Sequence, residues 1–162
     1  LPRDHHHRWP WRHSILEVGP AGGGFLETGA LHFRRMLNTD VRTAIEATSL
    51  AHLATVAPDG APHAVPVFVA TRGEQIVFFT GPQTRKARNL RHDPRVALSI
   101  TTTDNPFNPI VVRGRVVEWI DGDAGWEIVD AIQIKYTGSP YPRGQERVVA
   151  VIEPERQRVG VG

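Results

Sequence analysis

The stretch Phe79-Thr80-Gly81-Pro82-Gln83-Thr84-Arg85-Lys86 decides the architecture of this chain, because a strand end, a turn and a helix start follow one another within it. Residues 75–80 are rich in β-branched and aromatic side chains, which predicts a strand, and Gly81-Pro82 ends it. Thr84 can cap a helix expected over 85–92. The free N–H groups at that helix start favour an anion, and Arg85 and Lys86 add two cations. The segment predicts a phosphate site, with a solvated basic helix face as the alternative.

Short strands bounded by turn residues extend on both sides of this segment. Six strands are expected, and Gly114 predicts a bulge or a close backbone approach within the fifth. The expected strands are 52–56, 65–69, 75–80, 95–102, 110–120 and 148–152. Two further helices are expected at about 39–48 and 123–136 from the helical spacing of their apolar residues. Hairpin-linked strands with small helices between them predict a mainly β fold, a small antiparallel barrel.

Composition excludes several classes of protein. The chain has 162 residues and no cysteine, which rules out disulfides, thiolate metal ligands, iron–sulfur clusters and a cysteine nucleophile. It has no GxGxxG after the first strand and no phosphate-binding GxxxxGK[ST], so it is neither a Rossmann nor a P-loop protein. No apolar run approaches the roughly 18 residues of a membrane span, and we expect a cytoplasmic protein.

Residues 1–35 differ from the remainder. They hold five arginines against three acids, whereas residues 36–162 hold 14 basic and 14 acidic side chains and give no reason to expect a nucleic-acid partner. Three interpretations remain open: a segment upstream of a natural start at Met36, a disordered tail, or an arm docked on a partner subunit. The triplet His5-His6-His7 is a candidate metal ligand set, and we expect no physiological metal there.

Beyond these patterns, the order of short motifs resembles a known family. Phe79-Thr80, Arg85-Lys86 and the run 93–98 resemble the flavin-phosphate segment of the pyridoxamine 5′-phosphate oxidase-like split barrels. Other motifs resemble one branch of that family, the deazaflavin (coenzyme F420)-dependent reductases. They are Leu53-Ala54-Thr55, Asp59-Gly60-Ala61-Pro62-His63, Pro66-Val67-Phe68, Asp104-Asn105-Pro106-Phe107, Val112-Arg113-Gly114-Arg115-Val116-Val117-Glu118, Lys135-Tyr136-Thr137-Gly138, Tyr141-Pro142, Glu146-Arg147-Val148 and Ile152-Glu153-Pro154-Glu155-Arg156. The resemblance covers roughly residues 37–158.

The resemblance implies a six-stranded antiparallel split barrel, an FMN-binding split-barrel-like fold, for residues 36–162. It also implies a homodimer with the active site at the interface. The cofactor-binding residues that it implies lie on the second strand and around the phosphate turn. They are His63, Ala64, Val65, Pro66, Val67, Phe68, Phe79, Thr80, Thr84, Arg85 and Lys86. Neither a catalytic side chain nor a metal ligand is assigned.

The function implied is transfer of a hydride from reduced coenzyme F420 to an electron-poor conjugated small molecule. An FMN-dependent oxidase or reductase of the same fold is one alternative, and a non-catalytic flavin- or tetrapyrrole-binding protein is another. No tryptophan follows Ile152, although true pyridoxamine phosphate oxidases carry Trp and Arg residues there, so we do not expect oxidation of vitamin B6. Arg156 and Arg158 are candidates to neutralise an acidic coenzyme tail, although a surface role is the expected one.

Overall fold

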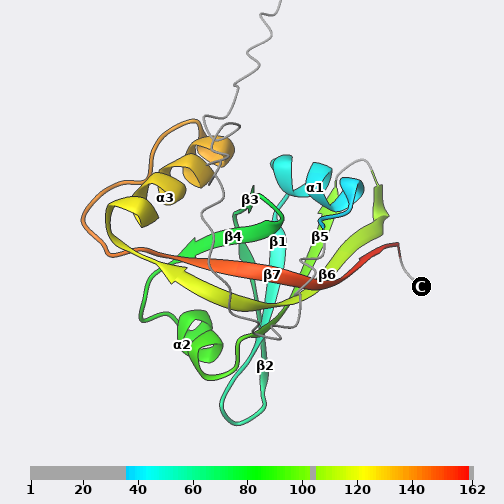
Figure 1. The fold of residues 1–162 in the computed structure, drawn as a ribbon, viewed down its shortest axis with the longest axis horizontal. Helices are drawn as coiled ribbons and strands as arrows, with labels where there is room; N and C mark the ends of the chain where they lie inside the picture. The colour runs from blue at the N-terminus through cyan, green and yellow to red at the C-terminus, as the bar shows by residue number, and fades with distance from the viewer. Residues whose placement is uncertain (1–35, 103–104, 161–162) are drawn as a thin grey trace, which may run out of the picture. The chain divides into compact units, whose positions relative to one another are not determined.

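The computed structural model describes residues 36–102 and 105–160 (Figure 1). The expectations for residues 1–35, including the histidine triplet, lie outside the described residues, and the division of the chain at residue 36 stays a prediction. Three helices and seven strands follow one another along the described chain. They are α1 (Thr39–Glu46), β1 (Ala51–Val56), β2 (Pro62–Val67), β3 (Val69–Arg72), β4 (Gln75–Thr80), α2 (Arg85–His92), β5 (Arg95–Thr102), β6 (Asn105–Ile120), α3 (Gly122–Thr137) and β7 (Val148–Val159).

All seven strands form one antiparallel sheet in the order β2-β1-β5-β6-β7-β4-β3. The two edge strands, β2 and β3, are consecutive in the chain, and only Phe68 separates them. Because one residue cannot span an open sheet of seven strands, the sheet curls until its two edges meet at Phe68. This geometry confirms the expected mainly β, antiparallel split barrel.

The strand count is where the sequence expectation was wrong. A single strand was expected over 65–69, but the chain changes partner within it, since β2 pairs with β1 and β3 pairs with β4. The reason lies at Phe68, whose ring stacks on that of Tyr136 with 4.0 Å between centroids and 6° between planes. The Tyr136 hydroxyl also accepts a hydrogen bond from the Val69 amide at 3.3 Å. These contacts to α3 break the strand and give seven strands instead of six.

The two longest strands also differ from expectation, and β6 begins at Asn105 rather than at residue 110. β7 continues past Ile152 to Val159, and Pro154 lies opposite Gly114 at a register shift between β6 and β7. A Cβ atom at Gly114 would lie 2.3 Å from the carbonyl oxygen of Glu153, so the expected close backbone approach is confirmed. A proline is tolerated at such an irregularity because no ladder N–H is needed there.

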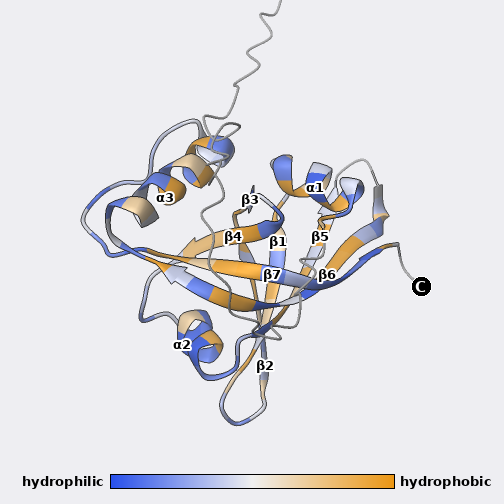
Figure 2. Cartoon of the chain, in the orientation of Figure 1, coloured by the Kyte–Doolittle hydropathy of each residue, from blue (hydrophilic) through white to orange (hydrophobic). Residues whose placement is uncertain are grey.

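The hydrophobic core lies on both faces of β4 and of the first part of β7 (residues 148–152), which are strongly apolar in Figure 2. Phe78 and Ile152 face the barrel interior, where α1 closes one end with Ile45. Val77 and Val151 face the opposite way and pack against α3. This packing buries the outer face of the two strands and fixes α3 to the barrel wall. The helix can therefore form one side of a site.

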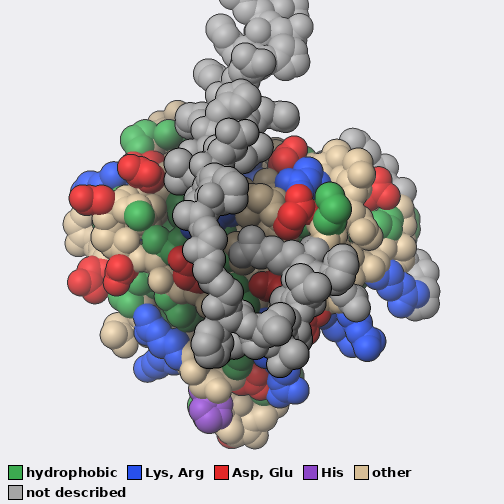
Figure 3. All heavy atoms as spheres, in the orientation of Figure 1, with side chains coloured by type: hydrophobic (Ala, Val, Ile, Leu, Met, Phe, Trp, Pro, Cys, Tyr) green, Lys and Arg blue, Asp and Glu red, His purple; other side chains and the backbone are tan. Residues whose placement is uncertain are grey.

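Two further features are the distribution of charge on the surface and the apolar length of the helices. On the face seen in Figure 3, Lys and Arg side chains lie in several separate groups, with Asp and Glu side chains among them. Among the described residues, no helix is both long and apolar enough to cross a membrane.

Candidate functional site

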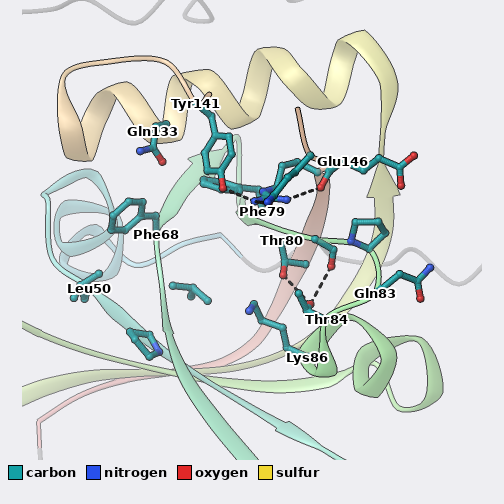
Figure 4. A pocket seen from close by; sticks show the side chains of 16 residues that line it. Leu50, Phe68, Phe79, Thr80, Gln83, Thr84, Lys86, Gln133, Tyr141 and Glu146 are labelled. Carbon is teal, nitrogen blue, oxygen red and sulfur yellow. Dashed lines mark hydrogen bonds between the residues drawn. The ribbon is translucent and has the colours of Figure 1, made fainter. Parts of the chain in front are cut away.

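A large open pocket lies beside Phe68, where the two edges of the sheet meet (Figure 4). Its volume is about 1010 Å³. The ends of β2 and β4, the start of α2, one side of α3 and the loop 138–147 contribute to its walls. The lining residues are Leu50, Pro66, Val67, Phe68, Phe79, Thr80, Gly81, Pro82, Gln83, Thr84, Lys86, Gln133, Tyr141, Gln145, Glu146 and Arg147.

One end of the pocket is polar and is built by the turn between β4 and α2. Thr84 caps α2, because its hydroxyl accepts a hydrogen bond from the Ala87 amide at 3.4 Å and donates one to the Gly81 carbonyl at 3.0 Å. The Thr80 hydroxyl lies 2.9 Å from the Thr84 hydroxyl. Since the hydrogen of Thr84 is engaged by Gly81, Thr80 is the donor in its bond to Thr84, and a ligand would have to replace Thr84 as the acceptor of the Thr80 hydrogen.

Lys86 adds a positive charge to the polar end. Figure 4 shows its side chain pointing into the pocket on the side of Thr80 and Thr84. In the described part of the chain, this half-buried amine has no hydrogen-bond or ion-pair partner. Burial and, to a lesser degree, the charge of Arg147 lower the pKa of Lys86 below its ordinary value. A cation held in this way, without a carboxylate, favours an anionic ligand.

The opposite walls are apolar and aromatic. Phe68 is held flat against Tyr136, and Tyr141 meets Phe79 edge to face with 5.3 Å between ring centroids. Leu50, Pro66 and Val67 complete this surface. An apolar wall next to a polar, cationic end fits a ligand that joins a flat ring system to a phosphate.

The position of Phe68 depends on the last turn of α3. The ammonium group of Lys135 donates hydrogen bonds to the carbonyl oxygens of Val69 and of Ile45, the latter at 2.5 Å. The Tyr136 hydroxyl donates to the Ser49 carbonyl at 2.9 Å. Burial lowers the pKa of Lys135 to about 8, while the carboxylate of Glu46 opposes that shift. The pocket wall at Phe68 is therefore tied to both α1 and α3.

The structure brings together seven of the eleven cofactor-binding residues expected from the sequence, namely Pro66, Val67, Phe68, Phe79, Thr80, Thr84 and Lys86. Four expected residues do not line the pocket. Arg85 is exposed, because neighbouring helix residues point about 100° apart and Lys86 takes the inward direction. His63, Ala64 and Val65 lie farther back along β2, and Val65 packs against the barrel core.

Sequence reasoning gave no role to the loop 138–147, which forms the outer wall. Asp130 of α3 holds this loop, since its carboxylate accepts hydrogen bonds from the Tyr141 amide at 3.1 Å and from Arg143 at 2.7 Å and 2.8 Å. The Arg143 guanidinium also lies over the Trp126 ring, 4.1 Å from its centroid. Tyr141 and Arg147 fell within motifs of the family resemblance, and that was the signal available for them.

The described residues contain no group of three or more His, Cys, Asp or Glu side chains placed to hold a metal ion. The polar side chains that line the pocket are hydroxyls, amides, the cations of Lys86 and Arg147, and a single carboxylate, that of Glu146. They fit an organic phosphate.

Comparison with known proteins identifies a family for this chain. Residues 37–159 match the family described as pyridoxamine 5′-phosphate oxidase. The chain belongs to this family. Proteins of the pyridoxamine 5′-phosphate oxidase family are generally flavin-related oxidoreductases. None of the curated proteins searched matches the chain.

Solved structures agree with membership in the pyridoxamine 5′-phosphate oxidase family. A protein named F420 reductase is 30% identical, with a TM-score of 0.66, and the match covers 72% of this chain and 94% of that one. A conserved hypothetical protein of Mycobacterium tuberculosis is 26% identical, with a TM-score of 0.62 and 82% and 89% coverage. A putative pyridoxamine 5′-phosphate oxidase of Listeria innocua is 21% identical, with a TM-score of 0.60 and 74% and 94% coverage, which supports the fold alone.

Proposed function

We propose that this protein is an oxidoreductase that uses reduced coenzyme F420 to transfer a hydride to an electron-poor conjugated small molecule. The observation that carries the proposal is the 30% identity to an F420 reductase across 72% of the chain. The pocket supports it, since a cationic end and an aromatic wall lie in one cavity. When bound, the deazaflavin would supply the hydride, while the protein supplies orientation and a dry surface.

The residues of the pocket divide this work between them. Lys86 and the Thr80 hydroxyl would hold the phosphate, because Lys86 carries a charge with no carboxylate partner in the described residues and Thr80 could donate to a phosphate oxygen in place of Thr84. Phe68 and Phe79 would exclude water from the ring system. The stack of Phe68 on Tyr136 keeps that surface in place without the ligand.

We also expect a homodimer, with the second subunit completing the site. The pocket is open to solvent on one side, and its β2 wall belongs to an edge strand. Sedimentation of the cofactor-bound protein at micromolar concentration would show a dimer. A monomer under these conditions would contradict this expectation.

FMN is the second candidate cofactor, because the family match supports flavin chemistry. The same phosphate end would serve FMN. In that case the protein would be an FMN-dependent oxidase or reductase, and Lys86 and Thr80 would hold the FMN phosphate.

Titration of the purified protein with F420 and with FMN, followed by absorbance and fluorescence, tests the proposal. We expect tighter binding of F420 than of FMN, and oxidation of reduced F420 when a conjugated enone such as cyclohexenone is added. Copurification of FMN that F420 does not displace would favour the FMN alternative. Binding without turnover of any acceptor would favour a carrier.

A further inference from the structure

Arg147 is the last residue before β7 and contributes a second cation to the pocket. Its guanidinium lies over the Tyr141 ring, 4.6 Å from the centroid, and donates a hydrogen bond to the Tyr141 hydroxyl. It also donates to the Gln145 side-chain oxygen at 2.8 Å and to the Glu146 carbonyl at 2.7 Å. All these acceptors are uncharged. Arg147 is therefore held in position while its charge stays uncompensated within the described part of the chain.

Five other arginines differ in this respect, because each is paired with a carboxylate. Arg143, four residues earlier in the same loop, is paired with Asp130 at 2.7 Å. Four more arginines are also paired with carboxylates at 2.6–2.9 Å, namely Arg42, Arg72, Arg95 and Arg115. Those five pairs lie outside the pocket, whereas Arg147 lines it. Among the described arginines without a carboxylate partner, Arg147 is the one that lines the cavity.

The two unpaired cations of the pocket lie close together. The positive charge of Arg147 contributes to lowering the pKa of Lys86, which places the two groups within electrostatic reach. The Arg147 guanidinium also reaches the turn that begins α2, since a Cβ atom at Gly81 would be 3.3 Å from the Thr84 side chain and 3.7 Å from that guanidinium. Two like charges in a half-buried site repel each other, and a ligand with two negative charges would relieve that repulsion.

We propose that Arg147 is an anion-binding residue of this pocket, and that Arg147 and Lys86 together take a ligand with two negative charges at its phosphate end. This inference rests on the proposed function for the nature of the ring that the ligand carries. Two chemistries meet the charge requirement. One is a terminal phosphate monoester, as in FMN, and the other is a phosphodiester with a neighbouring carboxylate, as in the acidic tail of F420.

The test compares ligands that differ at this end alone: FMN with riboflavin, and F420 with its deazaflavin core without phosphate and tail. We expect Arg147→Gln to weaken binding of the phosphorylated member of a bound pair about 10- to 100-fold, the value of a charge-assisted hydrogen bond. Binding of the unphosphorylated member should not change. The F420 pair and the FMN pair distinguish the two chemistries. The loss of affinity caused by Arg147→Gln should be larger for the phosphorylated ligand whose negative charges the pocket accommodates.

Arg143→Gln is the matched control, since it loosens the same loop without removing a charge from the pocket. It should change the affinities for FMN and riboflavin by the same factor. Arg147→Lys, which keeps the charge but loses the fork of donors, should recover part of the loss. In the double variant Lys86→Gln/Arg147→Gln, phosphorylated and unphosphorylated ligands should bind almost equally.

An Arg147→Gln variant that keeps the wild-type ratio of FMN to riboflavin affinity, and of F420 to core affinity, would overturn the inference. Equal losses for both members of a pair would also overturn it, as would wild-type protein that binds none of the four ligands. The proposed function fails separately. Absence of turnover with reduced F420, together with a reduced FMN-to-riboflavin ratio in Arg147→Gln, would reject the function and keep the assignment of Arg147.

Discussion

Two neighbouring segments line the pocket, and they are held by opposite means. The turn from Thr80 to Lys86 is fixed by its own residues, since its hydrogen bonds join groups three or four positions apart. The loop 138–147 is fixed mainly by α3, through Asp130, which lies 11 and 13 positions from its partners. The comparison teaches that one wall of the pocket is preformed locally, while the other depends on the tertiary structure.

The largest effect is expected from the charge that the turn presents. Lys86→Gln should weaken binding of F420 or FMN about 10- to 100-fold, because a charge-assisted hydrogen bond to phosphate is lost. The melting temperature of the free protein should not fall, since Lys86 has no partner in the described residues. Arg85→Gln, one position earlier and exposed, is the control and should change affinity less than about threefold. Equal losses in both variants would mean that general basic attraction, rather than a pocket residue, holds the ligand.

Breaking the loop anchor should give the next largest effect. Asp130→Ala removes the acceptor of the Tyr141 amide and of Arg143. Hydrogen bonds of this kind contribute about 1–2 kcal/mol together, which corresponds to a fall in melting temperature of about 2–8 °C. Calorimetry of the free protein measures it. If the melting temperature stays constant while ligand binding weakens, Asp130 orders the loop alone and does not stabilise the fold.

The pH dependence of stability tests the contribution of Lys135, which lies in the last turn of α3 just before the loop 138–147. The pKa of Lys135 is about 8 in the folded protein and about 10.5 when unfolded, so the unfolded state binds more protons between these values. The free energy of unfolding should therefore rise from pH 8 to 10.5. One pKa unit is about 1.4 kcal/mol, and solvent screening at this half-buried amine reduces the total to about 1–2 kcal/mol.

Urea denaturation at pH 7.5 and pH 10 measures this contribution, with Lys135→Met as the control. The variant should lack the rise, because it has no amine to titrate. A wild-type protein whose stability falls over this interval by the same amount as the variant would show that the two carbonyl contacts keep Lys135 charged.

The smallest effect is expected from the cap of the turn. Thr84→Ala removes the acceptor for the Ala87 amide and should cost about 1 kcal/mol. Thr84→Ser keeps the hydroxyl and should restore most of that stability. Thermal unfolding compares the three proteins. Identical melting temperatures would indicate that packing of α2 alone fixes the turn.

The same division explains what the sequence could predict. The bounds of α2 and of β4 were predicted correctly, because Thr84, Gly81 and Pro82 act on residues next to them. The break at Phe68 was not predicted, since it depends on Tyr136, 68 positions away in the sequence. The continuation of β7 through Pro154 likewise depends on Gly114 of another strand.

The site residues also divide into those that their own segment predicts and those that depend on the folded structure. Thr80, Thr84 and Lys86 could be named from one segment, and the structure places all three in the pocket. Arg147 could not be named from composition, because nothing in its own neighbourhood distinguishes it from the paired arginines. What distinguishes it in the described part of the chain is its place in the pocket wall together with uncharged hydrogen-bond partners.

The edge strand β2 has a consequence for how copies of this chain meet one another in concentrated solution. It contains Pro62 and Pro66, and alternate residues of a strand turn their amide groups to the same side. Proline is tolerated where that side is the open edge, so Ala64 alone offers an N–H among these three positions. An edge with so few donors is a poor template for adding another strand, which protects the protein against fibril-like growth from this side.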